Sequence, residues 1–272
     1  QQIEIVKGPS SLLYANGTIG GIINVVNNGI AEENFDKQEF ITGLETQSVN
    51  DGDIQHFNYK ENINGFNVNV GHKKSEFGNF DIPDGAILHE EEEHEGEEEE
   101  HEEENLGFVN NSDYMTEATK FGISKTRDWG YLGFSVDNLE SVYGIPFHGE
   151  EHEEHEGEEE EHEEERIFST TDSESFTVKG SLNMSGDLVN SVDFTFRDSD
   201  YILTEAHAEE EHEEHEGEED HDEEEHEEHE PTNFMSSSSE YGAIFDVSNN
   251  NMTQKIVLNV LDEDSSIIGE EA

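Results

Sequence analysis

Alternation of apolar and polar residues along most of the chain predicts antiparallel β-strands. In residues 175–184, Phe, Val, Gly, Leu and Met occupy the even positions, and Ser, Thr, Lys and Asn occupy the odd ones. A period of two is typical of a strand with one apolar and one polar face. The same pattern, interrupted by turn signals, predicts nine strands near residues 38–49, 53–62, 65–76, 116–126, 130–143, 174–185, 190–204, 239–248 and 253–262.

The links between these strands alternate in length. Four of them, at 62–64, 127–129, 186–189 and 249–252, are short, whereas three of the others contain long acidic tracts. In an up-and-down sheet, all three long links then fall on one rim. Short turns on one rim and long loops on the other are typical of outer-membrane β-barrels. A soluble antiparallel sheet alternates in the same way and is the alternative, but the one-sided loops favour the membrane.

Residues 1–30 have a different sequence pattern from the rest of the chain. Strand-like runs at 3–6 and 22–26 enclose a possible helix cap at 8–11 and glycines at 17, 20 and 21. This pattern predicts a compact α+β segment before the strands begin.

Composition adds a strong electrostatic constraint. The chain of 272 residues has 71 acidic and 12 basic residues and a formal net charge of -59. Nucleic acid is therefore excluded as a partner, since phosphate binding needs a basic surface. No run of about 18 apolar residues exists, so no transmembrane helix is expected.

Three low-complexity tracts, at 89–104, 150–165 and 205–230, carry 41 of the 71 acidic residues and no Lys or Arg. The eleven residues HEGEEEEHEEE occur at 94–104 and again at 155–165, and EEHEEHEGEE occurs at 150–159 and 210–219. One module has thus been used three times.

Thirteen of the 15 His lie in or beside the tracts, and we predict them as metal ligands: His89, His94, His101, His148, His152, His155, His162, His207, His212, His215, His221, His226 and His229. Imidazole and carboxylate ligands without any Cys favour a borderline divalent ion such as Zn²⁺, with Cu²⁺ or Ni²⁺ as alternatives. Ca²⁺ prefers oxygen ligands and has little use for imidazole. A Glu run alone is usually only a solvated segment, and the interleaved His are what indicate metal capture. The other two, His56 and His72, are expected to be ordinary strand residues.

No enzyme is expected. The nucleophile elbow, the P-loop and the dinucleotide fingerprint are missing from the sequence. The HEEH segments at 152–155 and 212–215 lack the full metalloprotease motif, and a catalytic zinc needs a rigid first coordination shell.

Two stretches of the first segment resemble a known family. IEIVKGPSSLLY at 3–14 and GTIGGIINVV at 17–26 are similar to the end of the plug domain of TonB-dependent outer-membrane receptors. Within that family, the zinc-uptake receptors with His-rich extracellular loops are the most similar, and segments 143–146, 231–234 and 267–272 also resemble theirs.

The resemblance implies an all-β fold: part of a transmembrane antiparallel β-barrel of about twenty-two strands, preceded by the end of an α+β plug. The C-terminal part of the plug would occupy residues 1–36, and the N-terminal part of the barrel would occupy 37–272, with extracellular loops at 86–112, 146–172 and 205–236. The chain is expected to be an internal fragment of such a receptor, and the TonB-contacting segment of the receptor would lie upstream of Gln1.

These observations predict a receptor in the bacterial outer membrane that imports a metal ion, with Zn²⁺ as its transported ligand and without an organic cofactor. Its partners would be the metal ion, outer-membrane lipid and the TonB complex. The alternatives are a receptor of the same class for haem, a metal-siderophore chelate, copper or nickel, or a non-transport acidic protein that buffers metal at a surface.

Overall fold

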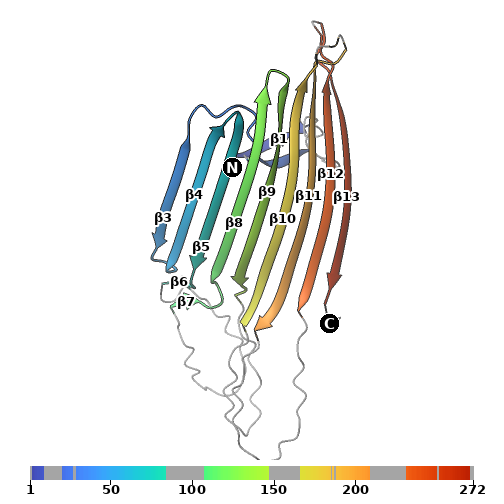
Figure 1. Ribbon diagram of the computed structural model, residues 1–272. Coiled ribbons are helices and arrows are strands. Elements are labelled where there is room, and N and C mark those ends of the chain that lie inside the picture. Colours follow the sequence, from blue (N-terminus) through green and yellow to red (C-terminus); the bar gives the residue numbers. More distant parts are fainter. Residues whose placement is uncertain are drawn as a thin grey trace, which may run out of the picture.

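A computed structural model describes residues 2–8, 20–26, 29–83, 107–146, 166–184, 186, 188–208, 231–249 and 251–269. Its main feature is one antiparallel sheet of nine strands in the order β13-β12-β11-β10-β9-β8-β5-β4-β3 (Figure 1). The strands are β3 (Glu39–Gln47), β4 (Gly52–Ile63), β5 (Phe66–Phe77), β8 (Tyr114–Arg127), β9 (Gly130–Gly144), β10 (Arg166–Asn183), β11 (Ser191–Ala208), β12 (Thr232–Asp246) and β13 (Lys255–Ile268). All nine predicted strands are present and adjacent in chain order, which confirms an antiparallel all-β architecture. Within the described residues, β3 and β13 are the two edges of this sheet, and no pairing joins them.

Two smaller pairs of strands accompany the sheet. β1 (Gln2–Lys7) and β2 (Gly21–Val26) form an antiparallel hairpin, which lies near the short-turn rim in Figure 1. β6 (Phe80–Asp81) pairs with β7 (Phe108–Val109), and the sequence pattern did not predict this short pair. The predicted helical turn after residue 8 falls on residues 9–19, which lie outside the described residues.

In the described part of the chain, no helix is long and apolar enough to cross a membrane.

The short links form tight turns at one rim of the sheet. Asn64 and Gly65 connect β4 to β5 with φ angles of 53° and 82°. Two successive residues with positive φ define a type I′ turn, whose twist suits a two-residue hairpin. Asn-Gly is the preferred sequence for this turn because both residues tolerate the left-handed region.

One face of the sheet, here called the belt face, carries a continuous apolar belt next to the short turns. Directly paired residues share a face, so the registers place these side chains together: Phe66, Val68, Val70, Phe121, Ile123, Leu132, Phe134, Val136, Phe176, Val178, Leu182, Val192, Phe194, Phe196, Tyr241, Ala243, Phe245, Ile256, Leu258 and Val260. Aromatic rings follow one another across the belt, from Phe134 to Phe176 at 6.4 Å, on to Phe196 at 6.4 Å, and to Tyr241 at 4.9 Å.

Burial is reversed with respect to a water-soluble sheet. On the opposite face, here called the polar face, Asn67 and Asn69 are only 1% and 2% exposed, whereas Phe134 and Leu258 in the belt are 44% and 58% exposed. Among the described residues, Tyr131 is the only large hydrophobic side chain that is buried, and it is 8% exposed. A soluble sheet instead covers its apolar face and leaves its polar face in water.

Several strands continue past the predicted ends at the rim that carries the long links. β10 begins at Arg166 rather than near residue 174, and β12 begins at Thr232 rather than near 239. The added stretches, RIFSTTDS at 166–173 and TNFMSSS at 232–238, lack a clear apolar alternation. Backbone hydrogen bonds to neighbouring strands hold them, and such bonds leave no periodic signal in the sequence.

Candidate metal-collecting rim

The thirteen predicted ligands lie outside the described residues, apart from the backbone of His207, which pairs with Ile167 in the register of β10 and β11. They are His89, His94 and His101 of the first tract; His148, His152, His155 and His162 of the second; and His207, His212, His215, His221, His226 and His229 of the third. Among the described residues, no group of three or more His, Asp or Glu could hold a metal ion. The structure therefore shows where the tracts are attached to the sheet.

The described residues that flank the tracts all lie at one rim. The first tract is inserted between Pro83 and Gly107 and the second between Pro146 and Arg166, while the third begins in the last residues of β11 and precedes β12. Because the sheet is antiparallel and strictly up-and-down from β5 to β13, these positions are at the end opposite the short turns (Figure 1).

Hydrogen bonds connect the base of the first tract to the base of the second. The buried amide of Asn111 donates to the carbonyl oxygens of Ile145 at 3.2 Å and Ile167 at 3.0 Å. Asp113 accepts an ion-paired hydrogen bond from Arg166, the residue that directly follows the second tract. A side chain that joins two backbone carbonyls while buried is a strong local constraint, since an unpaired buried carbonyl costs free energy.

The base of the second tract is next to the base of the third. Arg166 at the start of β10 is the direct partner of Ala208 at the end of β11. Paired strands lie about 4.8 Å apart. The points at which the second and third tracts join the sheet therefore lie on neighbouring strands.

Charge at this rim is strongly one-sided. Arg166 directly follows the second tract, and its guanidinium pairs with Asp113. The tracts themselves contain 41 acidic residues and no Lys or Arg. Divalent cations are the natural counter-ions for such a surface, which attracts them by its field.

A segment at residues 29–35, here called the strap, crosses the polar face close to the short turns. Ser124 donates to the carbonyl oxygen of Ala31 at 2.6 Å, and the backbone amide of Phe35 donates to the Oδ1 atom of Asn67 at 3.0 Å. Glu32 forms an ion pair with Lys179 on β10. The strap thereby joins β5, β8 and β10 on the polar face.

The sheet makes room for the strap with glycines. A Cβ atom at Gly122 would lie 2.0 Å from the carbonyl oxygen of Gly29, and one at Gly133 would lie 2.5 Å from the Ile30 side chain. Side chains at these two positions would push the strap away from the sheet. Neither contact leaves a signal in the sequence, because Gly122 and Gly29 are far apart along the chain.

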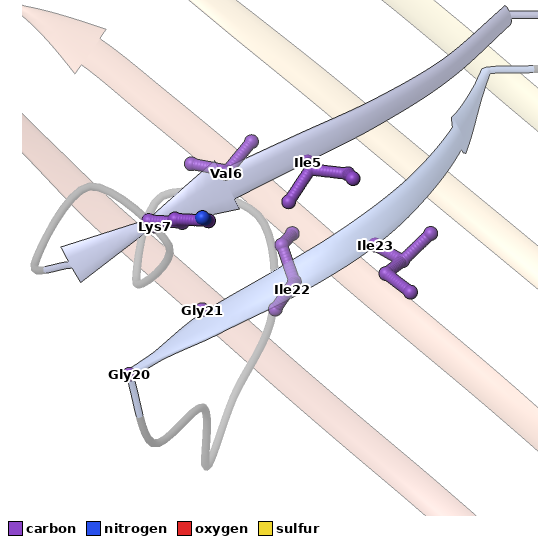
Figure 2. Close-up of a pocket in the computed structure, with 7 residues that line it drawn as sticks. All are labelled: Ile5, Val6, Lys7, Gly20, Gly21, Ile22 and Ile23. Carbon is purple, nitrogen blue, oxygen red and sulfur yellow. The ribbon is translucent and has the colours of Figure 1, made fainter.

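The hairpin of β1 and β2 has a shallow apolar hollow lined by Ile5, Val6, Lys7 and residues 20–23 (Figure 2). Ile5 and Ile23 are direct partners and are 68% and 71% exposed. Lys7 is the only charged side chain at the hollow, so this surface offers no set of ligands for a metal ion.

His56 and His72 occupy strand positions, as predicted. His72 on the belt face shares a hydrogen bond of 3.0 Å between its Nδ1 atom and the Oγ1 atom of Thr119. The ring of His56 lies over Gly43 on the polar face, where a Cβ atom would be 2.2 Å from it. Neither side chain is part of a group of metal-binding residues in the described structure.

A search against models of known protein families found none that matches this chain.

Proposed function

We propose that this chain is part of a TonB-dependent receptor of the bacterial outer membrane that imports a metal ion, with Zn²⁺ as its principal cargo. The observation that carries the proposal is the reversed polarity of the nine-stranded sheet, whose belt side chains are exposed while side chains of its polar face, such as Asn67 and Asn69, are buried. A lipid-facing barrel wall has this arrangement, with apolar residues toward lipid and polar residues toward the lumen.

The size of the belt supports a lipid environment. Monomeric soluble proteins rarely expose contiguous apolar patches of more than a few hundred Å². Here the belt runs across eight strands, from Ile63 on β4 to Leu258 on β13, and both of these side chains are more than 40% exposed. Lipid would cover this surface and remove its contact with water.

The strap supports a receptor rather than a simple pore. It connects the β1–β2 hairpin, whose sequence resembles the end of a plug, to the first strand of the sheet, and it lies on the face that would line the lumen. A plug inside a barrel requires a connection on this face.

The tracts supply the capture step. Their thirteen His and 41 acidic residues emerge from the rim that would face the outside of the cell. Labile His and Glu ligands would raise the local concentration of Zn²⁺ and release it toward the lumen. Such ligands do not exclude Cu²⁺ or Ni²⁺, which bind to similar groups.

A second candidate, a surface protein that only buffers metal, would use the same tracts but would not need the apolar belt. Receptors of the same class for haem or a metal chelate share the belt and differ in cargo. Uptake measurements separate these candidates.

The test compares zinc uptake by cells that carry the intact receptor with uptake by two variants. In one variant, Gly-Ser segments of equal length replace the three tracts; in the other, all thirteen His become Gln while every Glu remains. We expect both variants to lose most of their uptake at scarce zinc and little at abundant zinc, because capture limits uptake only under scarcity. Unchanged uptake by the Gln variant at scarce zinc would refute the role of the His, and uptake of haem but not zinc would identify the other cargo.

A further inference from the structure

The polar face carries a group of basic side chains that the capture of a cation does not explain. Although the chain has only 12 Lys and Arg, Lys60, Lys73 and Lys120 lie on this face of three neighbouring strands, β4, β5 and β8. Among the described residues, the ion pairs of the chain involve Lys74, Arg166 and Lys179, and none of them includes these three lysines.

Gly71 on β5 allows two of these lysines to approach each other. Gly71 pairs with Asn58 on one side and with Lys120 on the other. A Cβ atom at Gly71 would lie 2.6 Å from the Cε atom of Lys120 and 3.0 Å from the Nδ2 atom of Asn58. The Lys120 side chain therefore passes over Gly71 toward β4, the strand that carries Lys60 two residues beyond Asn58.

The arrangement is electrostatically unfavourable in the absence of an anion. Lys120 is half-buried, the charge of Lys60 repels it, and Asp137 on the neighbouring strand attracts it. Glu39 on β3 is the direct partner of Lys60, and Asp137 is that of Lys120, so two carboxylates face the three ammonium groups once Lys73 on the same face is counted. Like charges held together at a partly desolvated position mark sites where a ligand supplies the missing counter-charge.

We infer that Lys60, Lys120 and Lys73 form a binding site on the polar face for a small multivalent oxyanion, such as phosphate or a polycarboxylate. Lysine binds such anions as a compact point charge with three donors, and two or three of them match an anion with several oxygen atoms. The site is on the polar face rather than in the tracts, so it does not depend on the metal-binding role of the His. It goes beyond the proposed import of a metal ion, since it adds a ligand of opposite charge.

The test is calorimetry on the full chain in detergent micelles, freed of metal by a chelator, at low salt and neutral pH. The probes are inorganic phosphate and citrate. We expect at least one of them to bind, and Lys60→Gln and Lys120→Gln to weaken that binding about tenfold each, whereas Lys120→Arg retains it. Phosphate binding alone would indicate a small tetrahedral ligand, and tighter citrate binding would indicate a polycarboxylate.

Lys125→Gln is the matched control, since Lys125 lies on the same strand as Lys120 but on the belt face, where it contacts the Phe66 ring. Gly71→Ala tests position without removing charge, because the added Cβ displaces the Lys120 side chain, and we expect it to weaken binding as well. The inference is overturned if neither anion binds, or if Lys125→Gln weakens binding as much as Lys120→Gln does. Because metal is absent throughout, failure here leaves the zinc proposal untouched.

Discussion

Replacing a belt residue with arginine distinguishes a lipid-facing sheet from a soluble one. Phe134 lies in the middle of the belt on β9 and is 44% exposed. Roughly 90 Å² of a phenylalanine's surface of about 200 Å² is then left for lipid to cover. At about 25 cal/mol per Å², that contact stabilises the inserted protein by about 2 kcal/mol.

Arginine at this position would lose that contact and would also place a charge in hydrocarbon. An arginine near the bilayer midplane of a β-barrel costs about 2–4 kcal/mol. The expected loss for Phe134→Arg is therefore about 4–6 kcal/mol in lipid vesicles. If the belt were in water, the same substitution at a half-exposed position would change the unfolding free energy by about 0.5 kcal/mol or less.

The assay is denaturant unfolding of the full chain in phosphatidylcholine vesicles, followed by tryptophan fluorescence. Glu140→Arg is the matched control, since Glu140 is on the same strand and the same face, six residues nearer to the tract-bearing rim and outside the belt. We expect the control to stay within about 1 kcal/mol of the parent protein. Equal effects of the two substitutions would refute the argument that the belt faces lipid.

Two further substitutions test the rim and the strap. Asn111→Asp removes the two hydrogen bonds that join the bases of the first two tracts and should lower the unfolding free energy by about 2–3 kcal/mol. Asn110→Asp is the control and should have little effect, because its side-chain oxygen still accepts from the backbone amide of Asn111. Gly122→Ala places a Cβ against the Gly29 carbonyl and should cost about 1–3 kcal/mol. Gly242→Ala is the control, because the nearest atom to its Cβ is the flexible end of the Asn259 side chain at 3.2 Å and other contacts are at ordinary distances. Thermal unfolding measures all four, and a Gly122→Ala protein as stable as Gly242→Ala would contradict the packing of the strap.

Sequence pattern was sufficient for the strands but not for their environment. The period of two at 175–184 identifies β10, yet it does not reveal which face is covered, because a soluble sheet and a barrel wall alternate alike. The burial of Asn67 and the exposure of Phe134 are what the structure adds, and the proposed barrel wall rests on them. The parity of the short and long links was the better clue, since it correctly predicted that the tracts are attached at one rim.

Contacts between distant parts of the chain could not be predicted. The approach of Lys120 to Lys60 depends on the absence of a side chain at Gly71, and the strap depends on Gly122 and Gly133. Nothing in the local sequence marks these glycines as different from others in the strands. The first residues of β10 were missed for a related reason, because backbone pairing extends a strand without requiring an apolar pattern.

The central claim is tested most directly by titrating the intact chain and the Gly-Ser tract variant with Zn²⁺ and Ca²⁺ at pH 7.5 and pH 5.5. His-based capture predicts several zinc sites of about micromolar affinity at pH 7.5 that are lost in the variant, with weak calcium binding. Binding should weaken at pH 5.5, because His with an ordinary pKa of about 6.5 is then largely protonated and protons compete with the metal. Equal binding of zinc and calcium, insensitive to pH, would contradict the account and reduce the tracts to acidic spacers.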